Sequence, residues 1–348
     1  MTWMIYGAYG YTGRLVAALS TERGELPIIA GRDERRLRRL GEMFEVEHRS
    51  FDLSDPATIA RGLEGIDVVA HCAGPFSGTS SQMVDACLVT GTHYLDITGE
   101  IDVLEAVLAR DREAREAEVA LLPGSGFDVV PTDCLAAMLA SALPGAVRLE
   151  LAVRAHGSVS PGTARTAMES VGNMGRARVG GKIAPIPSDR RSRRVEFADG
   201  PAQVHALAWG DVATAYHSTS IPDVVVYAAL PLIATPVIAF GQIAGPAARS
   251  RVVRGMLKAV AGRLPGPSAE DRAKNRSQIW GEVTDAEGKS VSGTVTTLDP
   301  YDLTADSVVR IARRLAARQV TPGAHTPSQA LGAEFVRELD GVKVYDVG

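Results

Sequence analysis

The chain has 348 residues, which is enough for two domains of ordinary size. Its 45% hydrophobic and 22% charged residues are typical of a globular protein and exclude a disordered or collagen-like chain. A net charge of −4 gives no indication of a nucleic-acid partner. The three cysteines lack C-x-x-C spacing for zinc or redox chemistry, so no metal site is expected.

The chain opens with a buried strand that begins by Trp3, a glycine turn and an amphipathic helix. Gly7 permits a sharp exit from the strand, Gly10 lets backbone amides approach a phosphate, and Gly13 lets the helix pack closely on the strand. The helix N-terminus then offers unpaired N–H groups to an anion. An ordinary strand-to-helix turn is the alternative. The context predicts a dinucleotide site formed by Gly7, Tyr9, Gly10, Tyr11, Thr12 and Gly13.

The second strand ends where such folds select their cofactor. An Asp or Glu there binds the ribose hydroxyls of NAD, whereas an Arg accommodates the 2′-phosphate of NADP. Arg32 occupies this position, and Arg35 or Arg36 can supply a second positive charge. Arg38 and Arg39 fit a solvated helix face. The sequence therefore predicts NADP as the cofactor.

Two further segments are expected to contact this cofactor. Asp52 follows a third strand and can accept from the adenine amino group; the alternative is a helix cap, for which Ser54 or Asp55 is better placed. A fourth strand over 66–73 ends at the carboxyl end of the sheet, where ligands bind in open α/β folds. The backbone is expected to pass over the nicotinamide ribose at Ala73, Gly74, Pro75 and Phe76.

Strands and helices go on alternating, with a helix expected over 102–117 and a strand over 119–122. This pattern predicts an α/β fold with a Rossmann-type doubly wound parallel sheet over residues 1–130. Residues 131–300 are expected to form a second α+β domain for substrate binding or dimerisation. Residues 301–348 are expected to form a C-terminal helix and tail that return to the Rossmann domain.

Hydride transfer needs a proton source, and no Tyr-x-x-x-Lys pair follows the sheet. Carboxyl groups near one another can raise one pKa enough to make a proton donor. The candidate catalytic residues are Asp128, Tyr94 and Glu100, with Asp96 close by in sequence. Each also has a structural alternative: Asp96 and Glu100 can cap loops, Asp128 can fix a hinge, and Tyr94 can pack in the core.

The segment 224–248 contains no charged residue and is long enough to cross a bilayer. Its prolines and glycines argue against a single spanning helix. Three interpretations stay open: buried core, a homodimer contact, or an apolar wall for an acyl chain that also touches a membrane. Because the first strand begins by Trp3, no secretory signal is expected, and the predicted location is cytoplasmic, with membrane association as the alternative.

Several blocks of the sequence resemble the saccharopine dehydrogenase-like oxidoreductases, and among them the trans-acting enoyl reductase group. These blocks are residues 7–14, 73–76, 93–100, 126–133, 209–216 and 280–285. The resemblance implies an NADP-binding Rossmann domain and reduction with NADPH. It further implies enoyl (C=C) reduction of an acyl, polyketide or lipid-derived substrate, free or held on a carrier. An imine or keto reductase and a non-catalytic NADP-binding regulator are the alternatives.

Overall fold

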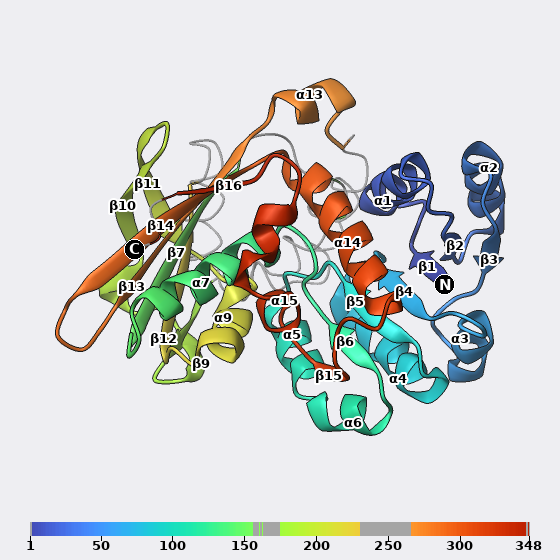
Figure 1. Cartoon of the computed structure of the whole chain (residues 1–348), viewed down its shortest axis with the longest axis horizontal. Helices are drawn as coiled ribbons and strands as arrows, with labels where there is room; N and C mark the ends of the chain where they lie inside the picture. The colour runs from blue at the N-terminus through green and yellow to red at the C-terminus, as the bar shows by residue number, and fades with distance from the viewer. Residues whose placement is uncertain are drawn as a thin grey trace, which may run out of the picture. The chain divides into compact units, whose positions relative to one another are not determined.

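The computed structural model describes residues 2–155, 160, 162, 175–229, 266–345 and 347. The chain forms two units (Figure 1). The first contains residues 1–130 and 301–332, and the second contains residues 131–300 and 333–348. Only the first part of the 301–348 segment thus lies with the N-terminal residues, whereas its last part adds a strand to the second unit.

The first unit is built on a seven-stranded, all-parallel sheet with the order β15-β6-β5-β4-β1-β2-β3. Its strands are β1 Trp3–Tyr6, β2 Ile28–Gly31, β3 His48–Ser50, β4 Val68–His71, β5 His93–Asp96, β6 Ala120–Leu122 and β15 Gly323–Ala324. The central strands β1, β2 and β4 are buried on both faces, as the continuous apolar runs in the sequence require. This is the doubly wound parallel sheet that the sequence predicts.

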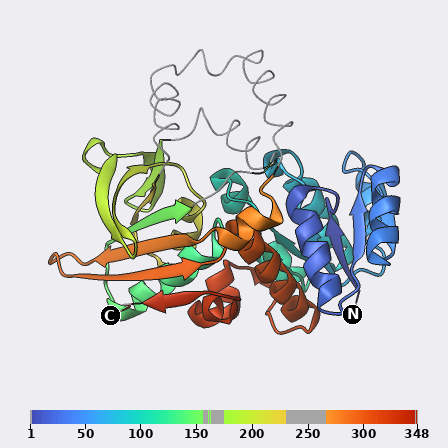
Figure 2. The same cartoon turned by 90° about the horizontal axis from the view of Figure 1, so that it is seen from above.

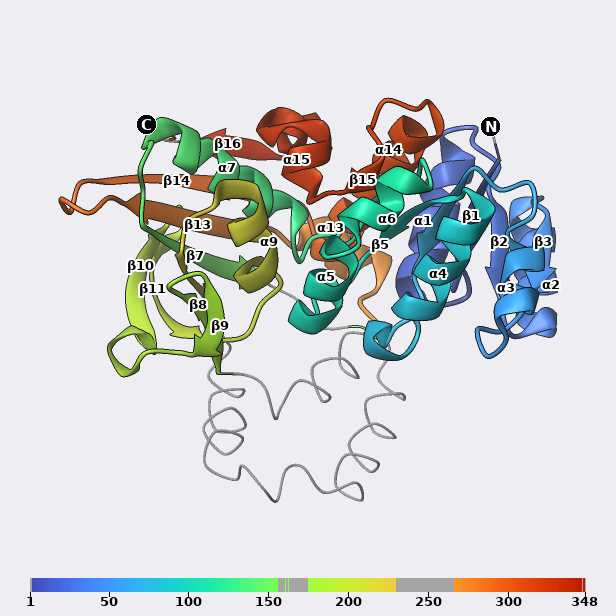
Figure 3. The ribbon, with the colours of Figure 1, turned by 90° about the horizontal axis from the view of Figure 1, so that it is seen from below.

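Helices connect these strands and cover the sheet (Figure 3). They are α1 Tyr11–Glu22, α2 Glu34–Phe44, α3 Pro56–Gly62, η1 Phe76–Gly78, α4 Ser80–Thr90, α5 Ile101–Leu108, α6 Asp111–Glu116, α14 Pro300–Ala316 and α15 Pro327–Leu331. Met4 and Tyr6 of β1 pack with Ile59 of α3 and Met83 of α4 in one buried apolar cluster. The single helix expected over 102–117 is wrong: α5 and α6 are separate, and only Ala114 of the charged second helix is buried.

Helix α14 joins the first unit although it lies some 180 residues after β6 in the sequence. Tyr301 at its start makes an edge-on contact with the ring of Tyr11, with the ring centroids 4.8 Å apart. Farther along, the buried carboxylate of Asp306 pairs with Arg23 at 2.6 Å and with Arg310 at 2.8 Å. These contacts fix α14 beside the start and the end of α1.

The second unit contains a mixed sheet with the order β10-β11-β12-β7-β13-β14-β16, and the β8–β9 hairpin adds to it at β12. Its strands are β7 Arg148–Ala155, β8 Arg176–Val179, β9 Lys182–Pro185, β10 Ser192–Phe197, β11 Gly200–Ala206, β12 Asp223–Ala228, β13 Ser277–Thr284, β14 Ser290–Thr297 and β16 Lys343–Tyr345. Its helices are α7 Val130–Ala142, η3 Ser188–Arg190, α9 Asp211–Thr219, α13 Ala269–Lys274 and η4 Ala333–Glu338.

Both faces of this mixed sheet are covered. On one face, Leu135 and Leu139 of α7 pack so closely on β13 that a Cβ at Gly281 would lie 2.8 Å from Leu139. On the other, β10 and β11 curve over the sheet, and Phe197 joins Trp280 in a buried cluster (Figure 2). The unit has the α+β character that the sequence predicts.

Part of the apolar segment 224–248 belongs to this sheet. Residues 224–228 lie in β12, where they are buried and pair in parallel with β7. The rest of the segment, 230–248, lies outside the described residues. For the described residues of 224–248, the structure supports the buried-core interpretation.

The close packing of α1 on the glycine turn generates the first prediction. A Cβ at Gly13 would lie 2.5 Å from the carbonyl oxygen of Gly7 and 2.9 Å from the Cα of Ala8, both backbone atoms. We expect Gly13→Ala to destabilise the protein by about 2 kcal/mol or more, because backbone cannot move aside as a side chain can. Gly78→Ala is the control, since its Cβ would meet open space. Equal urea midpoints for the two variants would contradict this account.

Candidate cofactor and active site

The candidate site lies at the edge where the parallel strands of the first unit end, here called the carboxyl edge. Strands β1, β4 and β5 end there in register at Tyr6, His71 and Asp96. The strand order reverses between β1 and β4, because β2 and β3 extend to one side and β5 and β6 to the other. A crevice at such a reversal is where doubly wound sheets bind their ligands.

The glycine turn meets this edge with the geometry that a dinucleotide requires. Gly7 has φ +84°, and a Cβ there would lie 2.9 Å from Ala73, so only glycine fits between β1 and β4. Gly10 is the N-cap of α1, no side chain caps the helix, and the first turn contains no acidic residue. The first-turn N–H groups, at Tyr11, Thr12 and Gly13, have no acceptor within the helix. They are suited to a phosphate.

The end of β2 carries the predicted specificity residue. Arg32 is exposed, and within the described part of the chain its guanidinium makes no hydrogen bond or ion pair. Arg36 is engaged, because it pairs with Asp33 at 3.4 Å and lies 5.7 Å from the ring centroid of Tyr9. The Tyr9 ring in turn lies so close to Gly31 that a Cβ there would be 2.7 Å from it. An available guanidinium thus lies at the end of β2, one residue after the glycine on which the Tyr9 ring packs.

Asp52 lies on the exposed loop after β3. Its Oδ1 accepts from the backbone N–H of Ser54 at 2.8 Å and from the Ser54 hydroxyl at 2.5 Å. The Ser54 hydroxyl bond is the main reason that the pKa of Asp52 is lowered. Asp52 caps no helix, since Asp55 caps α3 by accepting from Thr58. An ionised carboxylate is therefore available, and contact with adenine stays a prediction.

Asp96 accepts hydrogen bonds from several groups at the carboxyl edge. It is fully buried, and its Oδ1 accepts from the N–H groups of Thr98 and Gly124, each at 2.9 Å. Its Oδ2 accepts from the Tyr94 hydroxyl at 2.6 Å. Burial raises the pKa of Asp96 to about 6, although these three donors act in the opposite direction. The carboxyl thereby joins the end of β5 to the loop that follows β6.

The side chain of Tyr94 is enclosed in the first unit. Its side chain is fully buried in the apolar cluster beneath the sheet, and its hydroxyl donates to Asp96. Burial and the neighbouring Asp96 carboxylate raise its pKa well above 10. A hydroxyl enclosed in this way cannot reach a substrate, so the structure favours the packing alternative for Tyr94.

Asp128, by contrast, is only partly buried. It lies in the loop of residues 123–128 that follows β6, and its carboxyl group packs on Gly99, where a Cβ would be 3.0 Å from Oδ2. Burial raises the pKa of Asp128 to about 6. A carboxyl group with this pKa, on a residue that is only partly buried, is suited to proton transfer at a pH near 6.

Glu100 points to the loop that follows β4. Its carboxylate accepts N–H groups from Phe76 and Ser77 at 2.8 and 3.0 Å. In this loop Phe76 is buried and Gly74 is exposed, with Ala73 and Pro75 intermediate. The structure thus brings Glu100 together with the loop that is expected to pass over the nicotinamide ribose. Its carboxylate accepts two N–H groups of this loop, which agrees with the loop-capping alternative.

Sequence reasoning missed the residues of α14 that support this edge. Thr304 accepts the N–H of Phe127 at 3.0 Å through its hydroxyl, and Ser307 donates to the carbonyl of Ser125 at 2.9 Å. Nothing in the local pattern around 304 and 307 indicates a partner 180 residues earlier. The amphipathic pattern of the helix was the only signal available.

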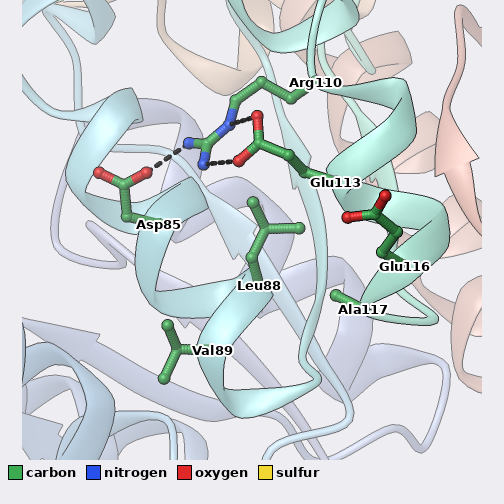
Figure 4. Close-up of a pocket in the computed structure, with 7 residues that line it drawn as sticks. All are labelled: Asp85, Leu88, Val89, Arg110, Glu113, Glu116 and Ala117. Carbon is green, nitrogen blue, oxygen red and sulfur yellow. Dashed lines mark hydrogen bonds and ion pairs between the residues drawn. The ribbon is translucent and has the colours of Figure 1, made fainter.

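A separate hollow of about 460 Å³ lies between α4 and α6 (Figure 4). Leu88, Val89 and Ala117 line it, and Arg110 beside them is already paired with Asp85 and Glu113. Helix α4 begins after the loop at the carboxyl edge and runs back toward the start of β5, so its last residues lie at the opposite edge of the sheet. The hollow is therefore not part of the candidate cofactor site.

Among the described residues, no cluster of three or more His, Cys, Asp or Glu side chains has an arrangement suited to a metal ion. In the same part of the chain, no helix combines the length and the apolar character needed to span a membrane.

Comparison with known proteins identifies the domain that carries this site. Residues 3–122 match the family described as the saccharopine dehydrogenase NADP binding domain. The matched residues make up most of the first unit and about a third of the chain. The match covers β1 through β6, including the glycine turn, Arg32 and the loop after β4, and it confirms the resemblance noted in the sequence.

Several known proteins are similar to part of this chain. The mouse saccharopine dehydrogenase-like oxidoreductase is 31% identical over 150 residues, which cover 37% of this chain and 35% of the mouse protein. The trans-acting enoyl reductase of Mycobacterium leprae is 30% identical over 139 residues, which cover 37% of this chain and 33% of that protein. The matched region therefore spans about a third of the length of each of these relatives.

A solved structure extends the likeness to the whole fold. Apo saccharopine dehydrogenase (L-Glu forming) from Saccharomyces cerevisiae covers 100% of both chains with a TM-score of 0.64 at 12% identity. At this identity the likeness shows the fold alone. Residues 3–122 thus match an NADP-binding domain family, and the whole chain is similar in fold to a solved dehydrogenase.

The hydrogen bond from Tyr94 to Asp96 generates a prediction about stability and pH. The pKa of Asp96 in the folded state, about 6, exceeds the ordinary 3.8, so its contribution to stability falls as the pH rises from about 4 to about 6. Tyr94→Phe removes a donor to the ionised form and raises this pKa further. We expect the variant to lose about 1–2 kcal/mol at pH 8 and less at pH 4, measured by urea unfolding.

Tyr6→Phe is the matched control for this measurement. The Tyr6 hydroxyl donates to the uncharged carbonyl of Phe51 at 3.0 Å, so its loss should cost a similar amount at both pH values. A pH-independent cost for Tyr94→Phe would show that Asp96 does not depend on this donor.

Proposed function

We propose that the protein is an NADPH-dependent reductase that acts on the carbon–carbon double bond of an acyl, polyketide or lipid-derived substrate. The observation that supports NADPH is Arg32, an exposed and unengaged guanidinium at the end of β2 in an NADP-binding domain. A guanidinium binds a phosphate with two parallel hydrogen bonds, whereas a carboxylate at this position binds the ribose hydroxyls of NAD.

In this proposal, different residues of the carboxyl edge bind the cofactor and supply the proton. The N-terminus of α1 binds the pyrophosphate through first-turn N–H groups, and Arg32 binds the 2′-phosphate. The loop after β4 lies at the reactive end of the dinucleotide. NADPH supplies a hydride when it is bound. Asp128 holds the proton that completes the reduction, since it is partly exposed and burial raises its pKa to about 6.

The choice of an enoyl substrate rests on the relatives that are named trans-acting enoyl reductases. An imine or keto reductase is the alternative, because the same family includes saccharopine dehydrogenase-like oxidoreductases. A homodimer, a cytoplasmic location and a lipid contact through 224–248 also stay predictions.

A panel of enoyl, keto and imine substrates of short and long chain length distinguishes these activities. The purified protein is incubated with deuterium-labelled NADPH, and the products are examined by mass spectrometry. Deuterium on a carbon of the former double bond supports the enoyl reductase. Label on a former carbonyl or imine carbon supports the alternative, and NADPH binding without turnover on any substrate favours a non-catalytic regulator.

Cofactor choice is tested with Arg32→Ala. We expect its Kd for NADPH to rise about 10- to 100-fold, because a charge-assisted contact to the 2′-phosphate is lost, and its Kd for NADH to change less than about twofold. Arg39→Ala is the control, since Arg39 is an exposed arginine of the adjoining helix α2. Equal losses for both cofactors would refute the role of Arg32.

The proton donor is tested with Asp128→Asn. A donor must be protonated, so turnover of the unaltered enzyme should fall as the pH rises through about 6, where the pKa of Asp128 lies. The variant should lose about 100-fold or more in kcat and lack this pH dependence. Asp55→Asn, which removes a carboxylate that caps α3, should behave like the unaltered enzyme. Unchanged turnover in Asp128→Asn would exclude it as the donor.

A further inference from the structure

The loop of residues 73–79, which joins β4 to α4, is bound on one side by Glu100. The two carboxylate oxygens of Glu100 each accept one backbone N–H, from Phe76 at 2.8 Å and from Ser77 at 3.0 Å. Glu100 is also the N-cap residue of α5, yet its side chain makes no capping bond to that helix. Its carboxylate is therefore used for the 73–79 loop instead of for its own helix.

Within the same loop, Thr79 bonds back to two loop carbonyls, and His71 of β4 bonds to Thr79 from the sheet. The Thr79 hydroxyl lies 2.9 Å from the carbonyl oxygen of Ala73 and 3.1 Å from that of Pro75, and 3.0 Å from Nε2 of His71. His71 is fully buried, and burial lowers its pKa to about 3, so the ring is neutral. Since the single Thr79 proton goes to a carbonyl, His71 donates from Nε2 to the Thr79 oxygen.

These contacts leave the backbone N–H and C=O of Gly74 open. Gly74 is exposed, and no described residue bonds to its N–H or its C=O. The residues on either side are held, Ala73 and Pro75 through their carbonyls and Phe76 through its N–H. The loop thus presents one donor and one acceptor at a fixed place on the carboxyl edge, beside Gly7 of the glycine turn.

We propose that Glu100 is a positioning residue, which holds the 73–79 loop so that the backbone N–H and C=O of Gly74 meet the reactive end of the dinucleotide. This inference rests on the proposed cofactor use. Glu100 acts here as an acceptor of two N–H groups and transfers no proton. It replaces the catalytic role that the sequence predicts for this residue.

The test compares Glu100→Gln and Glu100→Ala with Asp55→Asn, all in the full chain. Glutamine keeps the size of the side chain but has one acceptor oxygen, whereas alanine removes both acceptors. Asp55 likewise accepts a backbone N–H, from Thr58 at 2.8 Å, but at the start of α3. Hydrogen–deuterium exchange of the amides of Phe76 and Ser77, the Kd for NADPH and the pH dependence of turnover are measured for each variant.

We expect faster exchange at Phe76 and Ser77 in both Glu100 variants, and most in Glu100→Ala. The Kd for NADPH should rise about tenfold in Glu100→Ala and less in Glu100→Gln, while the shape of the pH profile is unchanged. Asp55→Asn should change exchange only at the start of α3. Unchanged exchange at Phe76 and Ser77 would overturn the proposal, and so would loss of a pH-dependent limb in Glu100→Gln, which would make Glu100 a proton donor.

The exchange measurement separates this inference from the proposed function. It needs neither substrate nor cofactor, so it reports whether Glu100 holds the loop in any case. Failure of the unaltered protein to bind NADPH would overturn the proposed function, and with it the positioning role, even where exchange shows that the loop depends on Glu100.

Discussion

The carboxylate of Asp96 is the group on which the carboxyl edge depends. A buried carboxyl is costly unless donors surround it, and Asp96 has three, from Tyr94, Thr98 and Gly124. Its backbone carbonyl also accepts the N–H of Ser125 at 2.6 Å. Asp96 thus holds two loops that follow different strands. Because Glu100 lies in the loop after β5 and Asp128 in the loop after β6, the positions of both residues depend on these hydrogen bonds.

The second support of this edge comes from the far end of the chain. Thr304 and Ser307 of α14 bond to the backbone of the 123–128 loop, and Tyr301 packs on Tyr11 at the start of α1. The first unit is therefore discontinuous in sequence. The predicted dinucleotide site has all of these supporting contacts only when α14 is present. A truncation before residue 300 would leave the 123–128 loop without two of its hydrogen bonds.

The sequence could predict what local patterns determine. Glycine spacing predicts the glycine turn, which is confirmed because Gly7 and Gly13 leave no space for a side chain. Apolar runs predict the parallel sheet, which is confirmed by the strand order and pairing. The hydrogen-bond partners of Tyr94 and Glu100 could not be predicted in this way. Whether a polar side chain faces solvent or a buried partner depends on strands and loops that are distant in sequence, and neither residue type nor spacing contains that information.

Asp96 and Asp128 show why a raised pKa does not by itself identify a proton donor. Burial raises both pKa values to about 6. Asp96 is fully enclosed, with both oxygens accepting hydrogen bonds, so a proton can neither reach it easily nor leave it without disturbing two loops. Asp128 is partly exposed on the 123–128 loop. Of two carboxyl groups with similar affinity for a proton, only the one that solvent or a ligand can reach is able to deliver it.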